Sequence, residues 1–429
     1  MIPYILKLFP KKTLYLNYVL LGLYVYYLGH LFYYYLFAEE KWTRVFNLIG
    51  VCLVLFGFIN IKKAINRCDR GFLLVYYIFM TVCVVNVIIG IPQMINEGRT
   101  AEMITNPQSM WMFLVGFAFI IPVTHIYIKQ IIKWALLYAF TSLLFSLFYF
   151  RDLFIDASQL VQSGVWDAFI LGRPQEPVFL LVPIAAFFMF FNFFPLKWRI
   201  LIIVSVLMAI LAAAMSGRRY VSLILIGYII IALYIYLIKR KSRWIRFIVL
   251  FSFVLFFITL LLSTQHSVGN FFDNNLVVLS NRINDDTRSD VETDFYKDMK
   301  DPSDFFWGRG MAGTYVSPLL SDIDHLHRRV VETGYLNIIL HGGLLMLVPY
   351  VYILLYAFFI GFFYSKNLFV KNCALFIIYH LLLLYPGGHT KLTLEFFILF
   401  LFIRICLTRR WRNMDNLVIK QTLAKSIMS

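Results

Sequence analysis

Long apolar segments, separated by short polar stretches, follow one another along almost the whole chain. Most of them approach the roughly 20 apolar residues that a helix needs to cross the hydrocarbon core of a bilayer. The tenth segment is long enough to contain a shallow entry helix over 330–342 before the true span, and the eleventh is short. The pattern predicts twelve membrane-spanning helices, over 16–37, 45–61, 71–91, 111–128, 134–150, 178–194, 200–215, 220–238, 247–263, 335–364, 373–385 and 392–408.

The overall composition agrees with this pattern. Hydrophobic residues make up 61% of the chain and charged residues only 14%, whereas soluble domains are roughly half apolar and about 25% charged. We therefore expect an all-α, polytopic membrane protein with about twelve transmembrane helices, forming a single membrane domain over 1–429. The five Cys residues include no C-x-x-C pair, so neither disulfides nor a structural zinc site is expected.

The basic residues are sorted by loop, and this sorting predicts the orientation of the chain. With the N-terminus in the cytoplasm, the inner segments hold 23 of the 39 Lys and Arg residues and only two acidic residues. The outer segments hold 15 Lys and Arg against 20 Asp and Glu. The positive-inside rule therefore places both termini on the cytoplasmic side of the inner (cytoplasmic) membrane. The same rule accounts for the net charge of +16 without a nucleic-acid partner.

Two outer loops are large enough to carry a functional surface. One covers 264–334, between spans nine and ten, and the other covers 151–177. Both contain Pro, Gly, Asp and Arg, and loops of this kind on a rigid scaffold are where binding and catalysis usually occur. The chain has no P-loop and no G-x-G-x-x-G motif, so we do not expect an ATP-driven machine.

Arginine is frequent in the outer segments, although the positive-inside rule disfavours it there. Its guanidinium group binds phosphate oxygens bidentately and keeps its charge in surroundings of low dielectric constant, which suits a lipid-linked pyrophosphate. For Arg309 and Arg329, pairing with nearby acidic residues is the simpler interpretation. The arginines that we assign to pyrophosphate binding are Arg173, Arg218, Arg219, Arg282 and Arg288.

A second group of reactive side chains lies in 321–332, at the end of the large loop. Asp322-Ile323-Asp324 matches the D-x-D pattern that holds a divalent ion in nucleotide-sugar transferases, but nucleotide sugars are cytoplasmic. General acid–base chemistry by Glu332, His325 or His327 is better supported, because a partly desolvated group beside arginines can be tuned for proton transfer. A solvated loop of mixed charge is the remaining interpretation.

Isolated polar residues also occur within or at the ends of the predicted spans. His30, His125 and His380 are expected to be hydrogen-bond partners between helices rather than ligands. Glu395 is a functional candidate, because an ionisable group within a span is costly unless it has a role. The residues around it assign it no specific role.

Several motifs occur in a characteristic order. The tight turn Ser216-Gly217-Arg218-Arg219 precedes two spans and a large outer loop that contains Gly308-Arg309-Gly310. The loop exit runs from Glu332-Thr333-Gly334-Tyr335-Leu336 to His341-Gly342-Gly343-Leu344-Leu345, and Gly172-Arg173-Pro174 lies in the earlier outer loop. Over roughly 170–350 this arrangement resembles the O-antigen ligase and polymerase family.

The loop exit departs from the family pattern H-N-x-x-L-x-x-x-x-E-x-G-L. This chain has Glu332 where the family has His, and His341 where the family has Glu. Under a different alignment, His327 takes the place of the family histidine.

The resemblance implies an extracytoplasmic glycosyltransferase that needs no metal or other cofactor. Its donor would be an undecaprenyl-pyrophosphate-linked glycan, and its acceptor a glycan or a lipid-anchored molecule. The arginines would hold the pyrophosphate, and Glu332 or His327 would deprotonate the acceptor hydroxyl. A polymerase is favoured over a ligase. The alternatives are a transporter or flippase of lipid-linked sugars and a scaffold without activity.

Overall fold

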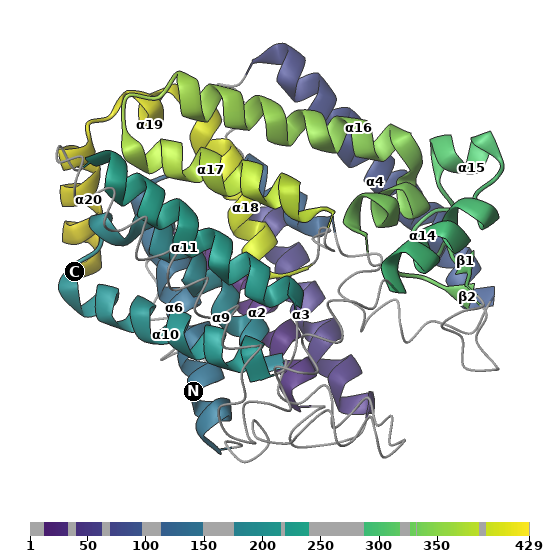
Figure 1. Cartoon of the computed structure of the whole chain (residues 1–429), viewed down its shortest axis with the longest axis horizontal. Helices are drawn as coiled ribbons and strands as arrows, with labels where there is room; N and C mark the ends of the chain where they lie inside the picture. The colour runs from purple at the N-terminus through teal and green to yellow at the C-terminus, as the bar shows by residue number, and fades with distance from the viewer. Residues whose placement is uncertain are drawn as a thin grey trace, which may run out of the picture. The chain divides into compact units, whose positions relative to one another are not determined.

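The computed structural model (Figure 1) describes residues 13–32, 40–61, 69–96, 113–148, 176–215, 219–239, 287–317, 327–331, 333–385 and 392–428. The chain divides into two compact units. The first consists of 1–135 together with 287–429, and the second of 136–286. We describe each unit by itself.

The first unit is built mainly from long apolar helices, to which a small polar layer is added. Its N-terminal part contains α2 (Leu14–Phe32), α3 (Glu40–Asn60), α4 (Arg70–Asn96), the 3-10 helix η3 (Leu114–Ile120) and the first turns of α6 (His125–Phe148). Its C-terminal part contains α14 (Thr287–Asp298), α15 (Pro302–Trp307), β1 (Tyr315–Val316), β2 (His327–Arg328), α16 (Gly334–Phe363), α17 (Leu368–Leu383), α18 (Leu394–Leu407), α19 (Arg409–Asn413) and α20 (Asn416–Met428).

Helices α2 and α3 approach each other closely through glycines. A Cβ atom added to Gly22 would lie 2.6 Å from the carbonyl oxygen of Gly50, and a Cβ added to Gly50 would lie 2.7 Å from that of Gly22. Small residues at such crossings let helix backbones pack tightly in membranes, where hydrophobic burial between helices contributes little. This pairing is typical of membrane-embedded helices.

Helix α18 lies at the centre of the first unit. Every one of its 14 residues is buried, and the helix packs against α16, α17, η3 and α2. A helix that is apolar on all sides is expected to be surrounded by other helices. The two charged residues within it, Glu395 and Arg404, are buried as well.

The second unit contains the C-terminal part of α6 and four further described elements. These four pack on one another. They are α9 (Glu176–Ala186), the 3-10 helix η5 (Phe187–Phe193), α10 (Leu196–Met215) and α11 (Arg219–Lys239). Phe187, Phe190 and Tyr228 are buried in this unit. Large aromatic side chains therefore fill the space between its helices.

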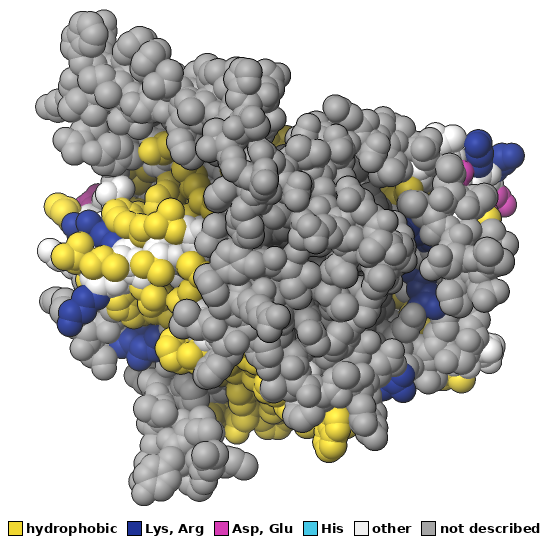
Figure 2. All heavy atoms as spheres, turned by 60° about the horizontal axis from the view of Figure 1, so that its bottom comes forward, with side chains coloured by type: hydrophobic (Ala, Val, Ile, Leu, Met, Phe, Trp, Pro, Cys, Tyr) yellow, Lys and Arg dark blue, Asp and Glu magenta, His cyan; other side chains and the backbone are white. Residues whose placement is uncertain are grey.

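The all-α membrane class is confirmed in its main feature. Among the described residues, four helices are long and apolar enough to cross a bilayer, over Trp42–Asn60, Arg70–Asn96, His125–Phe145 and Gly334–Phe363. Many large hydrophobic side chains remain on the surface, including Ile59, Ile88 and Leu207, and Figure 2 shows such side chains beside Lys and Arg. Twelve spans and a single membrane domain stay predictions.

Where the fourth span was expected, the structure differs. Within 111–128 the structure has the short helix η3, which ends before Pro122. Ile121 is extended (φ −70°, ψ 135°), because a residue before proline avoids the α-helical region. A new helix, α6, then begins at His125. The predicted inner loop 129–133 is consequently helical.

Cysteine labelling tests the predicted orientation. Ser303→Cys and Gln421→Cys place thiols at exposed positions of α15 and α20, in a background without Cys52 and Cys68. We expect a membrane-impermeant maleimide to label position 303 in intact cells and position 421 only after permeabilisation, because the positive-inside rule predicts that the basic segments face the cytoplasm. The reverse labelling would contradict both the orientation and any extracytoplasmic activity.

Candidate functional site

The described parts of the segment 264–334, which the sequence predicts to be an outer loop, form a compact layer at the N-terminal end of α16. Figure 1 shows α14, α15, β1 and β2 gathered beside this end. The strands are antiparallel, with Tyr315 opposite Arg328 and Val316 opposite His327. Buried residues of α14, β1 and α16 pack into one hydrophobic cluster, which includes Phe295, Tyr315 and Leu336. We call α14, α15, β1 and β2 the outer layer.

Helix α16 is broken beneath the outer layer. Gly343 has φ 63° and ψ −169° inside the helix, a conformation that is essentially restricted to glycine. The break separates a short helix over 334–342 from a longer one over 344–363. A separate helix before the longer one, predicted over 330–342, is therefore present and begins at Gly334. Its shallow position in the membrane stays a prediction.

A second glycine meets the break. Gly308, which ends α15, has φ 73° and ψ −179°. A Cβ atom on Gly308 would lie 2.6 Å from the backbone nitrogen of Gly343, and one on Gly343 would lie 2.1 Å from the carbonyl oxygen of Phe306. The backbone at the end of α15 therefore contacts the backbone at the break of α16, and neither Gly308 nor Gly343 leaves space for a side chain.

The start of α15 is fixed locally. Asp301 caps the helix by accepting a hydrogen bond from the backbone nitrogen of Ser303 at 2.9 Å, and Pro302 follows at the first helical position. This hydrogen bond lowers the pKa of the Asp301 carboxyl below its ordinary value. The cap directs the short helix toward the break in α16, which Gly308 contacts.

Arg309 is the central charged residue of the outer layer. Its Nε donates to Asp304 at 2.8 Å, and its Nη1 donates to Asp298 and to the carbonyl oxygen of Thr314. Its backbone nitrogen donates to the carbonyl oxygen of Leu340 at 2.7 Å. Partial burial disfavours the guanidinium charge, but the hydrogen bonds to Asp304 and Asp298 outweigh it and raise the pKa of Arg309. The expected pairing of Arg309 with nearby acids is thus confirmed.

Two polar side chains, His341 of α16 and Asn86 of α4, lie next to the break. His341 is buried, and its Nδ1 lies 3.1 Å from the carbonyl oxygen of Gly310. Met311 donates its backbone N–H to the carbonyl oxygen of Asn86 on α4 at 3.4 Å. The Nδ2 of Asn86 is buried and has no hydrogen-bond partner among the described residues, whereas the buried ring of His341 also lies against the backbone of Arg329. Buried polar groups at a helix break within a membrane are candidates for function.

The segment on either side of Glu332 is held tightly. Val331 and Thr333 are both fully buried. The backbone nitrogen of Val331 donates to the side chain of Asn337 at 3.0 Å, and the Thr333 hydroxyl donates to Glu292 on α14. These contacts fix the chain at the entrance to α16, although Glu332 itself lies outside the described residues.

A buried polar pair lies between α17 and α18. The Nε2 of His380 is 3.5 Å from a carboxylate oxygen of Glu395, so His380 contacts a polar group of the neighbouring helix, as expected. The C-terminal end of α17 also contacts the entrance to α16, because Gly334 donates its backbone N–H to the carbonyl oxygen of Leu384 at 2.7 Å. His380 is thus the partner of Glu395, and the residues next to Glu395 in the sequence did not indicate it.

Most of the predicted site residues are not tested by these contacts. His327 is described, and its side chain is exposed on β2. Arg219 and Arg288 lie in the first turns of α11 and α14, but their side chains fall outside the described part. The predicted site residues that lie wholly outside the described residues are Glu332, Arg173, Arg218 and Arg282.

Sequence reasoning missed two features of the site. Asn86 occupies an apolar span and gave no signal by itself, since a single Asn often bonds a neighbouring helix. Gly342-Gly343 was visible inside a long apolar segment, and paired glycines can mark a helix break. Among the described residues, no group of three or more His, Cys, Asp or Glu side chains is placed to hold a metal ion.

Comparison of the chain with protein-family models, with curated proteins and with solved structures finds no match.

Proposed function

We propose that the chain is a membrane-embedded glycosyltransferase that moves a glycan from an undecaprenyl-pyrophosphate carrier to an acceptor at the extracytoplasmic surface. The observation that carries this proposal is the polar outer layer, which sits on a broken membrane helix with the buried side chains of His341 and Asn86 beneath it. An acceptor and a lipid-linked donor would meet at such a surface, because the lipid tail needs helices and the sugars need a polar cover.

The charged residues of the proposed site divide into two roles. The guanidinium group of Arg309 donates hydrogen bonds to Asp298, Asp304 and the carbonyl oxygen of Thr314. Its role is therefore to hold the outer layer together. We assign pyrophosphate binding to the other arginines of the predicted outer segments, which are Arg173, Arg218, Arg219, Arg282 and Arg288. A guanidinium group there would also stabilise the charge that develops as the carrier leaves.

The proposed reaction is a displacement at the anomeric carbon of the donor sugar. The acceptor hydroxyl oxygen forms the new glycosidic bond while the bond from the anomeric carbon to the pyrophosphate oxygen breaks. The hydroxyl proton passes to Glu332 or His327, and undecaprenyl pyrophosphate leaves with the bonding electrons. His341 is buried, which favours a role in positioning the loop at Gly310 over a role as the base. The reaction as proposed needs no metal or other cofactor.

A transporter or flippase of lipid-linked sugars is the second candidate. The break in α16 favours it, because transporters often bind substrate at discontinuous helices. Purified protein in detergent separates the two functions. A transferase forms product from lipid-linked donor and acceptor without a membrane to cross, whereas a transporter leaves both unchanged.

A deletion strain tests the class of transferase. If the chain is a polymerase, single repeat units should accumulate on the lipid carrier, because donor units are made but not joined. If it is a ligase, long chains should accumulate instead. Accumulation of neither would contradict the proposed function.

Substitution of Arg288 tests the pyrophosphate assignment. Arg288→Lys keeps the charge but loses the bidentate fork, so we expect turnover to fall roughly tenfold to a hundredfold, in line with a lost charge-assisted contact. Lys297→Gln is the matched control, since it changes an exposed basic residue on the same helix. Glu332→Gln should retain donor binding but lose turnover. Equal activity of Arg288→Lys and the parent would remove Arg288 from the site.

A further inference from the structure

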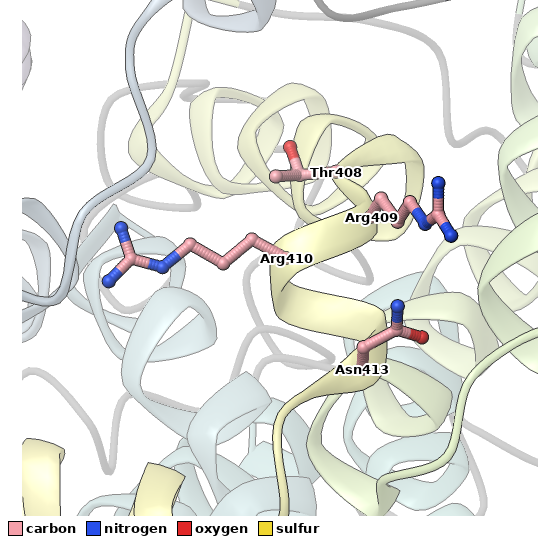
Figure 3. Close-up of a pocket in the computed structure, with 4 residues that line it drawn as sticks. All are labelled: Thr408, Arg409, Arg410 and Asn413. Atoms are coloured by element: carbon pink, nitrogen blue, oxygen red, sulfur yellow. The ribbon is translucent and has the colours of Figure 1, made fainter.

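A hollow of about 430 Å³ lies beside the short helix α19, lined by Thr408, Arg409, Arg410 and Asn413. Figure 3 shows the Arg409 and Arg410 side chains extending to opposite sides of this helix. The Thr408 hydroxyl already donates to the carbonyl oxygen of Arg404 at 2.8 Å. Because these side chains do not converge on one ligand, we assign no ligand to this hollow.

A row of aromatic rings crosses the outer layer, from α15 over α14 to the start of α16 and the end of α17. The rings of Phe305 and Tyr296 are stacked, with 6.4 Å between their centroids and 24° between their planes. At the other end, the ring of Tyr335 stacks on that of Tyr385, with 6.5 Å between the centroids and 12° between the planes. A hydrogen bond between the side chains of Tyr296 and Tyr335 joins the two stacks. We call these four residues the aromatic row.

The aromatic row is held in place by the protein and remains accessible. Phe305 and Tyr335 pack on the hydrophobic cluster of α14, β1 and α16. The backbone hydrogen bond of 2.7 Å from Gly334 to the end of α17 keeps Tyr385 beside Tyr335. Tyr296 is nevertheless 47% exposed, and Tyr385 is 59% exposed. The row therefore presents ring surface to a ligand from a fixed base.

The aromatic row lies next to the segment that contains Glu332. Tyr335 follows Glu332 by three residues. Glu292, which accepts a hydrogen bond from the Thr333 hydroxyl, lies four residues before Tyr296 on α14. Residues four apart are neighbours on one side of a helix. A carboxylate, tyrosine hydroxyls and flat rings therefore occur together beside the proposed proton acceptor.

Tyrosines near the ends of membrane helices also occur in the aromatic belts at the membrane surface. The composition of α14 does not fit that interpretation. Helices that lie in the interface are rich in Lys and Arg, whereas anionic headgroups repel carboxylates. A carboxylate instead accepts hydrogen bonds, which the hydroxyl groups of a sugar can donate. Helix α14 carries four acidic residues, which are Asp290, Glu292, Asp294 and Asp298.

We propose that the aromatic row binds the glycan substrate, with pyranose rings stacked on the exposed rings of Tyr296 and Tyr385. A pyranose ring has an apolar face of C–H bonds and a rim of hydroxyl groups. It therefore matches a flat aromatic ring that is bordered by an acceptor such as Glu292. Exposed rings at both ends of the row suit an oligosaccharide better than a single sugar. This inference rests on the proposed glycosyltransferase function and names where its glycan is held.

Glycan binding by the full-length purified protein tests this proposal. The probe is the oligosaccharide released by mild acid from the lipid-linked pool of the producing cells, titrated into protein in detergent and followed by saturation-transfer-difference NMR. Tyr385→Leu should weaken binding roughly threefold to tenfold, because it removes one stacked ring. Tyr385→Phe keeps the ring and should bind like the parent. Tyr296→Leu gives a second test at the other end of the row.

The matched control is Tyr364→Leu, because Tyr364 is also exposed, at 68%, but directly follows the C-terminal end of α16. It should bind the oligosaccharide like the parent. Equal binding by the parent and Tyr385→Leu, as an aromatic belt predicts, would overturn the glycan site even if transfer is intact. Absence of binding by the parent would overturn it as well.

Kinetics separate this inference from the proposed reaction. In the transfer assay, Tyr385→Leu should raise KM for the glycan and leave kcat unchanged, because the ring binds the substrate away from the reacting atoms. A fall in kcat at unchanged KM would contradict a binding role. Oligosaccharide binding that depends on Tyr385, without any transfer product from the parent, would overturn the proposed reaction but support the glycan site.

Discussion

Replacing Gly343 by alanine is expected to destabilise the protein by about 3 kcal/mol or more. The added Cβ would lie 2.1 Å from the carbonyl oxygen of Phe306 and 2.6 Å from the backbone nitrogen of Gly308. Both obstacles are backbone atoms, which cannot rotate away as a side chain can. In addition, alanine disfavours the φ of 63° at this position. Thermal unfolding in detergent measures the effect.

Gly310→Ala provides the matched control. Gly310 also has a positive φ of 75°, but a Cβ there would meet no atom closer than 3.7 Å. Its cost should therefore be limited to about 1 kcal/mol of backbone strain. If the two variants unfold at the same temperature, the contact between Gly308 and Gly343 does not hold the outer layer on α16. Limited proteolysis of the outer layer should also increase in Gly343→Ala alone.

Replacing Arg309 by methionine is expected to cost about 2–3 kcal/mol of stability. Breaking a fully buried ion pair costs more, but the Arg309 side chain is 25% exposed, and water screens part of the loss. The substitution leaves the carboxylates of Asp298 and Asp304 without their shared cation. It also removes the donor to the carbonyl oxygen of Thr314. Arg309→Lys should lose about half as much, because lysine keeps the charge but cannot form the same set of bonds.

Two further variants separate charge from packing in this network. Adding Asp298→Asn and Asp304→Asn to Arg309→Met removes the unpaired charges, so part of the stability should return. Lys300→Met, at an exposed position two residues after the end of α14, should change stability by less than about 0.5 kcal/mol. A loss in Lys300→Met as large as in Arg309→Met would show that the effect does not come from the network.

The outer layer connects these stability effects to the proposed activity. Arg309 and Gly308 hold α15 on the break of α16, while Glu292 and Asn337 hold the two sides of Glu332. A proton-transfer group and phosphate-binding arginines need fixed positions to act together. Variants that loosen the layer should therefore lower turnover even where they leave the proposed catalytic residues unchanged. Comparison of activity with unfolding temperature across these variants measures that link.

The sequence by itself determined the class of the protein and the course of several segments. Membrane helices are recognised from composition and length alone, because each must satisfy its own backbone hydrogen bonds and face lipid. The separate helix before the tenth predicted span was also foreseen, since a largely apolar segment of 30 residues exceeds one bilayer crossing. The pairing of Arg309 with acids was also predictable, because Asp298 and Asp304 are close to it in the sequence.

Local signals were weaker where a single residue redirected the chain. Pro122 ends η3 and allows α6 to begin at His125. Hydropathy alone predicts one span over 111–128, followed by a basic loop over 129–133. Apolar periodicity cannot separate a 3-10 helix from an α-helix over so few residues. Pro122 marks in the sequence where the helix is interrupted. The interruption itself arises because the proline holds the backbone of Ile121 in an extended conformation.

Only the tertiary structure decided which distant residues meet. Gly308 and Gly343, His341 and Gly310, and Thr333 and Glu292 are in contact although 31 to 41 residues separate the members of each pair. No periodic pattern in the sequence links such positions. Their contacts depend on how closely two backbones approach and on which buried polar group needs a partner. The membrane class follows from each segment separately, whereas the candidate site exists only because several segments pack together.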